Sequence, residues 1–312
     1  LGAFPALLLL AVFLRVWLRI LKPFLHIRFG RMWSQSIGTW MAMEIYLCEK
    51  DAGKHPKNTW DIFYHFNPDR YALKNPPKPR DQVPNHQADI MLSPYLRIWQ
   101  FASALDDLNR LLPRGSEDYI TPLPSAIDQH DMLHQYPRHF DFSEDEEKRG
   151  LAGLGELGLE HDAKFVCFHV RDGAYLYHSM PRMVSLYGDW TDLPSRNASL
   201  ANSLLAADRL TDLGYYVIGM GQWAKEPLIH GNPRVIDYAT RFRSDFMDVF
   251  LSARCAFFIG TNSGMTSIPM MFRTPVALVN VMPLSSLDYT GARDVYIPKT
   301  YYSASKGRLL TF

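Results

Sequence analysis

The segment Phe165-Val-Cys-Phe-His-Val-Arg-Asp172 decides the fold class. Its first six residues are apolar except for one histidine, which is typical of a strand buried on both faces. Downstream, short apolar runs alternate with amphipathic stretches. They predict strands at 215–218, 234–238, 256–259 and 275–280, and helices at 200–213, 245–254 and 263–272. Strands that alternate with helices form a doubly wound parallel sheet.

The first half of the chain shows the same alternation with longer connections. We expect strands at 25–29 and 60–65, helices at 39–51, 87–99 and 102–112, and a proline-rich loop at 67–84. An acidic run at 141–147 indicates a helix start or a linker near a domain boundary. The predicted architecture is therefore α/β and GT-B-like. It has a helix at 1–24, an acceptor-side Rossmann-like domain at 25–148 and a nucleotide-binding Rossmann-like domain at 149–312, facing each other across a crevice.

The composition is that of an ordinary globular chain, because 47% of the 312 residues are hydrophobic, 21% are charged and the formal net charge is +1. Nucleic-acid-binding proteins usually carry a clear basic excess, so we expect no nucleic-acid partner. The three cysteines, Cys48, Cys167 and Cys255, cannot form a disulfide framework, and their spacing matches no zinc motif. They indicate buried, reduced thiols in a cytoplasmic protein.

The N-terminal segment departs from this average. Residues 1–14 carry no polar side chain, Arg15, Arg19 and Lys22 follow at helical spacing, and the first acidic residue is Glu44. The apolar run is shorter than the ~20 residues that cross a bilayer. The chain starts without Met, so we expect a fragment of a longer protein. The segment fits the end of a membrane anchor, a helix on an anionic leaflet, or a core helix with a solvated basic edge. Of these, we favour membrane contact.

Ligands of open parallel sheets bind beyond the carboxyl ends of the strands, so the residues after each strand are candidates for a binding site. In the second half these positions, together with the approach to the helix at 200–213, hold His169, Arg171, Asp172, Arg196, Asn197, Gly221, Asp237, Tyr238, Thr261, Asn262, Ser263 and Gly264. Arg171 offers a planar fork of donors that suits a diphosphate, and an ion pair with Asp172 is the structural alternative. His169 points to the same face of the strand as Arg171. For His169 we expect a functional role and a role as a buried core residue equally.

The stretch Gly260-Thr-Asn-Ser-Gly264 predicts an anion site, because a glycine-rich turn that opens a helix presents free N–H groups. It is neither a P-loop nor a G-x-G-x-x-G fingerprint, and an ordinary capped turn is the alternative. Ser244 and Asp245 either cap the helix at 245–254 or reach a donor. No Asp-x-Asp triplet occurs, so we expect no metal and no other cofactor. Arg171 and backbone N–H groups would then neutralise a leaving diphosphate.

Several of these motifs recur together in one known group. Phe168-His-Val-Arg-Asp172, Arg196-Asn197, Met220-Gly221, Asp237-Tyr238, Ser244-Asp-Phe-Met-Asp248 and Gly260-Thr-Asn-Ser-Gly264 resemble a group of bacterial glycosyltransferases that is similar to the GT-B fucosyltransferase superfamily. The resemblance covers about residues 160–285. It implies a nucleotide-sugar donor whose diphosphate contacts Arg171, with His169 beside it and the serine-containing turn holding the donor. Ala174 and Gly219 depart from the pattern, which leaves the donor open.

The resemblance implies a metal-independent glycosyltransferase of hexosyl or fucosyl type, which moves sugar from a nucleotide sugar to a hydroxyl of a cell-envelope glycan or another acceptor. It would act in the cytoplasm, with attachment to the inner face of the cytoplasmic membrane as an option. Acceptor-side candidates in the first half are Arg31, Ser34, Ser36, Gly38, Glu44 and His65. Glu44, His65 and Asp61 could each serve as base. The alternatives are a non-catalytic nucleotide- or sugar-phosphate-binding module and a nucleotide-sugar epimerase.

Overall fold

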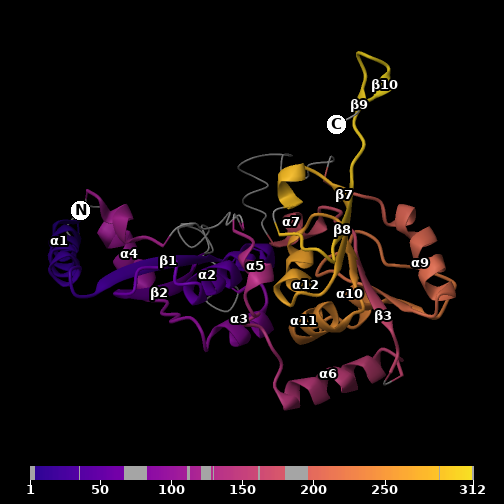
Figure 1. Cartoon of the computed structure of the whole chain (residues 1–312), viewed down its shortest axis with the longest axis horizontal. Helices are drawn as coiled ribbons and strands as arrows, with labels where there is room; N and C mark the ends of the chain where they lie inside the picture. Colours follow the sequence, from indigo (N-terminus) through magenta and orange to yellow (C-terminus); the bar gives the residue numbers. More distant parts are fainter. Residues whose placement is uncertain are drawn as a thin grey trace. The chain divides into compact units, whose positions relative to one another are not determined.

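The computed structural model describes residues 4–34, 36–66, 83–110, 113–120, 128, 130–160, 162–179, 196–287 and 289–310. The chain divides into two compact units, Leu1–His139 and Phe140–Phe312, which we call the first and second unit (Figure 1). The position 148/149, where we expected a boundary, lies inside the helix α6 (Glu144–Glu156) of the second unit. Most of the predicted proline-rich loop at 67–84 lies outside the described residues.

The second unit contains a six-stranded parallel sheet with the strand order β5-β4-β3-β6-β7-β8. The strands are β3 (Phe165–His169), β4 (Tyr216–Gly219), β5 (Val235–Asp237), β6 (Phe258–Gly260), β7 (Val276–Val281) and β8 (Val295–Pro298). The chain runs outward from β3 to β5 and returns to the other side of β3 with β6. The strand order therefore reverses between β3 and β6, which makes this edge the topological switch point.

Helices cover both faces of this sheet. Ala207 and Leu210 of α9 (Leu204–Asp212) pack against Val166 and Phe168 of β3. On the opposite face the Cys167 thiol donates to a backbone carbonyl of α11 (Asp245–Arg254). Figure 1 shows α9 on one side of the strands and α11 on the other. The sheet is doubly wound, as the sequence predicted.

The elements begin and end where the sequence gives local signals. Ser143 caps α6 in a capping box with Glu146, so the acidic run lies in the first turn of a helix. Gly214, with a φ of 90°, follows the end of α9. The remaining helical elements of the second unit are α7 (Ala174–Ser179), η6 (Leu200–Ser203), α10 (Tyr238–Arg241), η7 (Gly264–Thr266), α12 (Ser267–Met271) and η8 (Leu284–Leu287). The sequence analysis missed β8 and the hairpin of β9 (Tyr302–Ser303) and β10 (Arg308–Leu309), because these strands are short and exposed.

The first unit is built on the parallel pair β1 (His26–Trp33) and β2 (Thr59–Phe66). Single parallel bridges, Phe29 to Tyr119 and Phe63 to Ile98, continue the pairing on each side. The helical elements are α1 (Phe4–Leu21), η1 (Ile37–Trp40), α2 (Met41–Asp51), α3 (His86–Leu92), α4 (Ala102–Arg110), η4 (Gly115–Asp118) and α5 (Met132–Gln135). The helix expected at 87–99 ends early at Leu92, because Pro94 has no backbone N–H to continue the helical hydrogen bonds.

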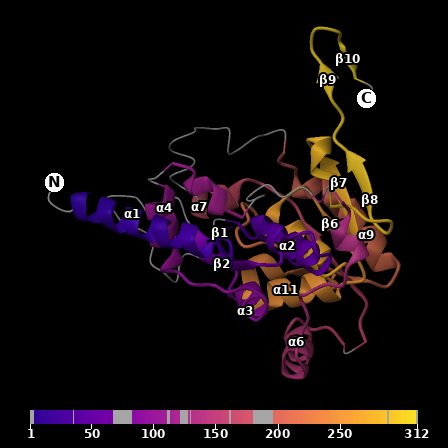
Figure 2. The same cartoon turned by 60° about the vertical axis from the view of Figure 1, so that its left-hand side comes forward.

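The helix α1 packs on the first unit with a face that combines leucines and the buried Arg15, while Arg19 stays exposed. Arg15 is 7% exposed and forms an ion pair with buried Asp118, and Lys22 Nζ lies 3.4 Å from the same carboxylate. Leu18 joins the core beside α4 (Figure 2). The expectation of a core helix with a solvated basic edge is therefore wrong for Arg15. Among the helices described, none combines the length and the apolar character needed to span a bilayer.

Candidate nucleotide-binding site in the second unit

The loops after β3 and β6 are joined at the switch point. The Arg171 N–H donates to Thr261 Oγ1 at 2.9 Å, and the Thr261 N–H donates to the carbonyl of His169 at 3.2 Å. Thr261 is buried. A Cβ on Gly260 would lie 2.4 Å from Thr266 Cγ2, so glycine is required for Thr266 to pack under the turn. The two motifs that the sequence analysis singled out thus form one rigid edge.

Three cationic side chains gather at this edge. The Arg171 guanidinium donates to Asn197 Oδ1, and Lys299 Nζ donates to the Asn197 carbonyl at 2.8 Å. Arg196 Nη2 donates to the carbonyl of Asn262, within the turn, at 3.3 Å. Arg196 and Asn197 therefore lie beside Arg171, as expected from the sequence. Lys299 follows β8, and no sequence signal pointed to it.

Two polar groups at this edge lack partners. Arg196 Nε and Ser263 Oγ are buried and have no hydrogen bond within the described part of the chain. No carboxylate among these residues forms an ion pair with Arg196, and burial lowers the pKa of its guanidinium. Both atoms lie at the edge where the sequence predicts an anion site, and each could donate to an anionic ligand there.

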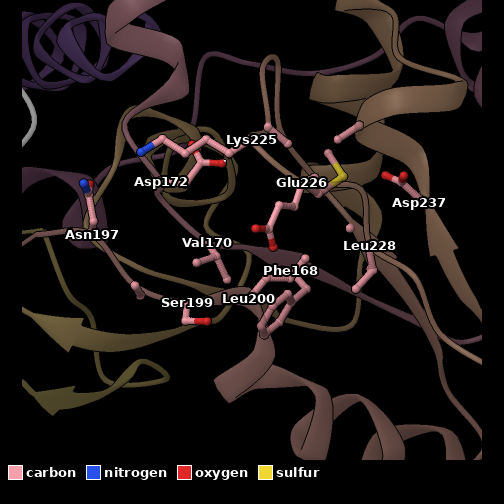
Figure 3. Close-up of a pocket in the computed structure, with 15 residues that line it drawn as sticks. Phe168, Val170, Asp172, Asn197, Ser199, Leu200, Lys225, Glu226, Leu228 and Asp237 are labelled. Atoms are coloured by element: carbon pink, nitrogen blue, oxygen red, sulfur yellow. Dashed lines mark hydrogen bonds between the residues drawn. The ribbon is translucent and has the colours of Figure 1, made fainter. Parts of the chain in front are cut away.

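A pocket of about 230 Å³ opens at the carboxyl ends of β3, β4 and β5 (Figure 3). Its lining residues are Phe168, Val170, Asp172, Asn197, Ala198, Ser199, Leu200, Gly219, Met220, Ala224, Lys225, Glu226, Leu228, Asp237 and Ala239. Phe168, Leu200 and Leu228 form an apolar side, and Asp172, Asn197 and Lys225 lie together elsewhere on the wall (Figure 3). A flat apolar surface beside polar groups suits a nucleoside.

The two predicted acids in this pocket are also structural. Asp172 accepts from the N–H of Ala174 at 2.9 Å and from that of Lys225 at 2.6 Å, so it holds the loop after β4. Asp237 caps α10 by accepting from Thr240 N–H at 3.3 Å. Glu226 and Lys225 of the loop after β4 were missed by the sequence analysis, because nothing in their spacing marks a site.

His169 is a neutral imidazole with a defined tautomer. Its Nδ1 lies 3.0 Å from the carbonyl oxygen of Met220. Because a carbonyl oxygen can only accept a hydrogen bond, we place the hydrogen on Nδ1. Burial lowers the pKa of His169. Nε2 is therefore the acceptor nitrogen. Gly221 follows Met220 at this position.

Three predicted donor-binding residues have structural roles in the second unit and do not line the pocket. The Tyr238 hydroxyl lies 2.9 Å from Asp248 Oδ1 in the core, where burial raises its pKa. Ser244 Oγ accepts from Met247 N–H and caps α11. Asp245 pairs with Arg243 at 2.8 Å.

The acceptor-side residues lie in the first unit, where most of them form hydrogen bonds or ion pairs with neighbouring residues. Arg31 Nε donates to the Tyr64 hydroxyl at 2.8 Å and its Nη2 lies 3.3 Å from Asp106. Ser36 caps η1 by accepting from Gly38 N–H. Ser34 is buried at the end of β1, and its Oγ has no hydrogen bond within the described residues.

The three residues considered as a base differ in their surroundings. Asp61 accepts from Arg28 at 2.7 Å and from the Tyr46 hydroxyl. Glu44 is fully buried beside His139. His65 Nε2 lies 3.3 Å from Asp89 Oδ1, and its Nδ1 has no hydrogen bond among the described residues. Of the three, His65 is the one with a ring nitrogen, Nδ1, that could accept a proton and that has no hydrogen bond among the described residues.

These features define an α/β protein of GT-B type, which confirms the predicted fold class. The structure is similar to a solved glycosyl transferase family 9 protein from Veillonella parvula, with a TM-score of 0.50 and 11% identity over 90% of this chain and 89% of that one. It is also similar to ADP-heptose lipopolysaccharide heptosyltransferase II from E. coli, with a TM-score of 0.49 and 15% identity over 89% and 91% of the two chains. No protein-family model and no curated protein matches the sequence. The first likeness shows a shared fold, and the fucosyltransferase resemblance stays a prediction.

Proposed function

We propose that this protein is a glycosyltransferase whose second unit binds a nucleotide sugar. Arg171, Arg196 and the turn at 260–264 hold the diphosphate, and the pocket beside them takes the nucleoside. The observation that carries the proposal is the pair of unsatisfied groups, Arg196 Nε and Ser263 Oγ, at the switch point of the sheet. The fold likeness to a family 9 glycosyltransferase agrees with it.

In this reaction an acceptor hydroxyl attacks the anomeric carbon of the donor. A bond forms between the acceptor oxygen and that carbon, the bond from the carbon to the diphosphate oxygen breaks, and the acceptor proton passes to a base. The positive charges of Arg171 and Arg196 stabilise the leaving diphosphate, so no metal is needed in this proposal. We assign the base to His65 because its Nδ1 has no hydrogen bond among the described residues.

Calorimetry with a panel of nucleoside diphosphates tests the donor site. The wild-type chain should bind at least one of them, and Arg171→Ala should bind it at least tenfold more weakly, because a hydrogen bond to a charged group contributes ~1.5–3 kcal/mol. Arg209→Ala is the matched control, since Arg209 is an exposed arginine of the same unit. Equal affinities of Arg171→Ala and wild type for every nucleotide would overturn the diphosphate site.

A screen for hydrolysis of nucleotide sugars then separates the function classes. A transferase should slowly release nucleoside diphosphate from its donor without an acceptor. Binding without release or transfer would identify a binding module instead. Conversion of one nucleotide sugar into another would identify an epimerase.

We also propose that α1 lies on an anionic membrane surface. Its outer side exposes Leu9 (71%), Phe13 (61%), Ile20 (57%) and, just beyond the helix, Phe24 (80%). A hollow beside this stripe is lined by Arg19, Lys22, Pro23, Arg114 and Glu117, so three cations face one acid. An apolar stripe next to basic side chains is the pattern of a helix in a lipid interface.

Sedimentation with vesicles tests this attachment. The chain should sediment with vesicles containing phosphatidylglycerol and much less with phosphatidylcholine alone. Phe13→Glu with Ile20→Glu should abolish binding, whereas Leu205→Glu, an equally exposed apolar site in the second unit, should not. Sedimentation without vesicles would show that the stripe binds a second copy and would contradict the proposal.

A further inference from the structure

Glu44, Cys48 and His139 form a compact cluster in the first unit, far from the nucleotide-binding site in sequence. Glu44 and Cys48 stand four residues apart on α2, so their side chains share one face of the helix. His139 is the last residue of the unit. One potential ligand atom of each residue, a carboxylate oxygen, a thiol sulfur and an imidazole nitrogen, lies within 4.8 Å of the others.

Two contacts in this cluster, made by different oxygens of Glu44, are close to the separation between ligands of one small cation, and the three ligand atoms all lie within 4.8 Å of one another. His139 Nδ1 lies 3.3 Å from Glu44 Oε2, and Cys48 Sγ lies 3.8 Å from Glu44 Oε1. Zinc takes sulfur at ~2.3 Å and nitrogen or oxygen at ~2.0–2.2 Å in a tetrahedron, so its neighbouring ligands are separated by about 3.3–3.6 Å. The side chains of Glu44 and Cys48 are fully buried, and that of His139 is 12% exposed.

The surroundings of His139 also match a metal ligand. Its second nitrogen, Nε2, lies 3.1 Å from Asp51 Oδ2, at the end of the same helix. A carboxylate on the far nitrogen of a ligating histidine fixes the ring and leaves the near nitrogen for the metal. The backbone N–H of His139 donates to Glu44 Oε1 at 3.3 Å, which anchors the two ligands to each other.

Charge balance permits two states of this site. Without a metal, the His139 ring lies 3.3 Å from the Glu44 carboxylate and can form an ion pair with it. With Zn²⁺, a thiolate and a carboxylate would balance the ion, because the ligands of a bound metal are deprotonated.

We propose that Glu44, Cys48 and His139 bind one Zn²⁺, with water as the fourth ligand, and thereby fasten the end of the first unit to α2. The site is structural and independent of the proposed sugar transfer. Glu44 is then a metal ligand and not an acceptor-side base.

Cobalt titration of the full chain, stripped of metal with a chelator, tests this site. Co²⁺ bound by a thiolate in a tetrahedral site gives a charge-transfer band in the near ultraviolet and strong visible bands. We expect these bands to saturate at one equivalent and to disappear when Zn²⁺ is added. Absence of a saturable band in the wild-type chain would refute the site, whatever the variants do.

Substitutions assign the ligands. Cys48→Ser should lose the charge-transfer band, and Glu44→Gln should weaken Co²⁺ binding at least tenfold. Cys255→Ser is the matched control, because Cys255 is a buried free thiol of the second unit. Far-ultraviolet circular dichroism shows whether each variant is folded. A band that survives in Cys48→Ser and is lost in Cys255→Ser would place the metal elsewhere.

Discussion

Arginines beside the strands of the first unit are paired with carboxylates, whereas Arg196 at the switch point of the second unit has no carboxylate partner among the described residues. In the first unit, Arg28 of β1 and Asp61 of β2 form a buried ion pair, and Asp61 also accepts a hydrogen bond from the Tyr46 hydroxyl. At the switch point of the second unit, Arg196 Nε and Ser263 Oγ have no partner among the described residues. If the proposed donor site is right, charged residues near strand ends stabilise the fold of the first unit and bind a ligand in the second.

Removing a carboxylate in the first unit should give the largest effect. Asp61→Asn leaves Arg28 buried without its counter-charge, and breaking such a pair costs ~3–5 kcal/mol. We expect urea unfolding to show this loss for the first unit. Nucleotide affinity should not change.

Asp107→Asn is the matched control for Asp61→Asn, because Asp107 is 35% exposed and lies 3.7 Å from Arg31. Exposed pairs contribute at most ~1 kcal/mol. If both variants lost the same stability, the buried Arg28–Asp61 pair would stabilise the first unit no more than an exposed pair does. The comparison between paired and unpaired arginines would then fail in the first unit.

Removing a cation in the second unit should show the reverse pattern. Arg196→Ala should weaken binding of the preferred nucleoside diphosphate by ~1.5–3 kcal/mol, roughly tenfold to a hundredfold. Stability should stay the same or rise slightly, because a buried charge without a carboxylate partner is removed. Calorimetry and thermal unfolding measure the two quantities on the same protein. A large loss of stability with unchanged affinity would make Arg196 a structural residue.

The strands β3 to β7 of the second unit were predicted well because they are largely buried and appear in the sequence as continuous apolar runs. The helix predicted at 245–254 matches α11, since Ser244 supplies a cap and Cys255 ends the pattern. The edge made by Arg171, Arg196 and the turn at 260–264 follows from the rule that parallel strands end at one edge. Lys225 and Glu226 could not be found this way, because a loop folds them into the pocket and no period marks them.

The sequence was less informative for the first unit and for the cluster of Glu44, Cys48 and His139. Within the described residues of that unit, two strands are long enough to show alternation, and the other pairings are single bridges. His139 lies 95 residues from Glu44, so no local spacing could indicate a shared site. The side of α1 that faces the unit was also unpredictable, because its buried Arg15 depends on a distant carboxylate at Asp118.

Acid should lower the unfolding free energy of the first unit by protonating Asp61. The loss should be smaller than the loss caused by Asp61→Asn. Burial alone would raise the pKa of Asp61, but the hydrogen bond from Arg28 outweighs it, and the pKa in the folded state is lowered. A lowered pKa gives stability that is present above the unfolded value of ~3.9 and is lost as pH falls through the folded value. Urea unfolding at pH 5 and pH 3 should therefore show a fall in the wild type and a shallower one in Asp61→Asn. Parallel falls would show that Asp61 is not the titrating group.

Two serines of the second unit give the smallest and sharpest test of the contrast. Both stand before helical turns and both were candidates for donor binding, but Ser244 Oγ accepts from Met247 N–H at 3.2 Å, whereas Ser263 Oγ has no partner among the described residues. Ser263→Ala should therefore weaken nucleotide binding by ~0.5–1.5 kcal/mol, the net contribution of one hydrogen bond, without loss of stability. Ser244→Ala should lower the unfolding free energy by ~1 kcal/mol, as loss of a helix cap does, and leave affinity unchanged. If Ser244→Ala weakened binding and Ser263→Ala only destabilised the fold, the donor would lie along α11 and not at the switch point.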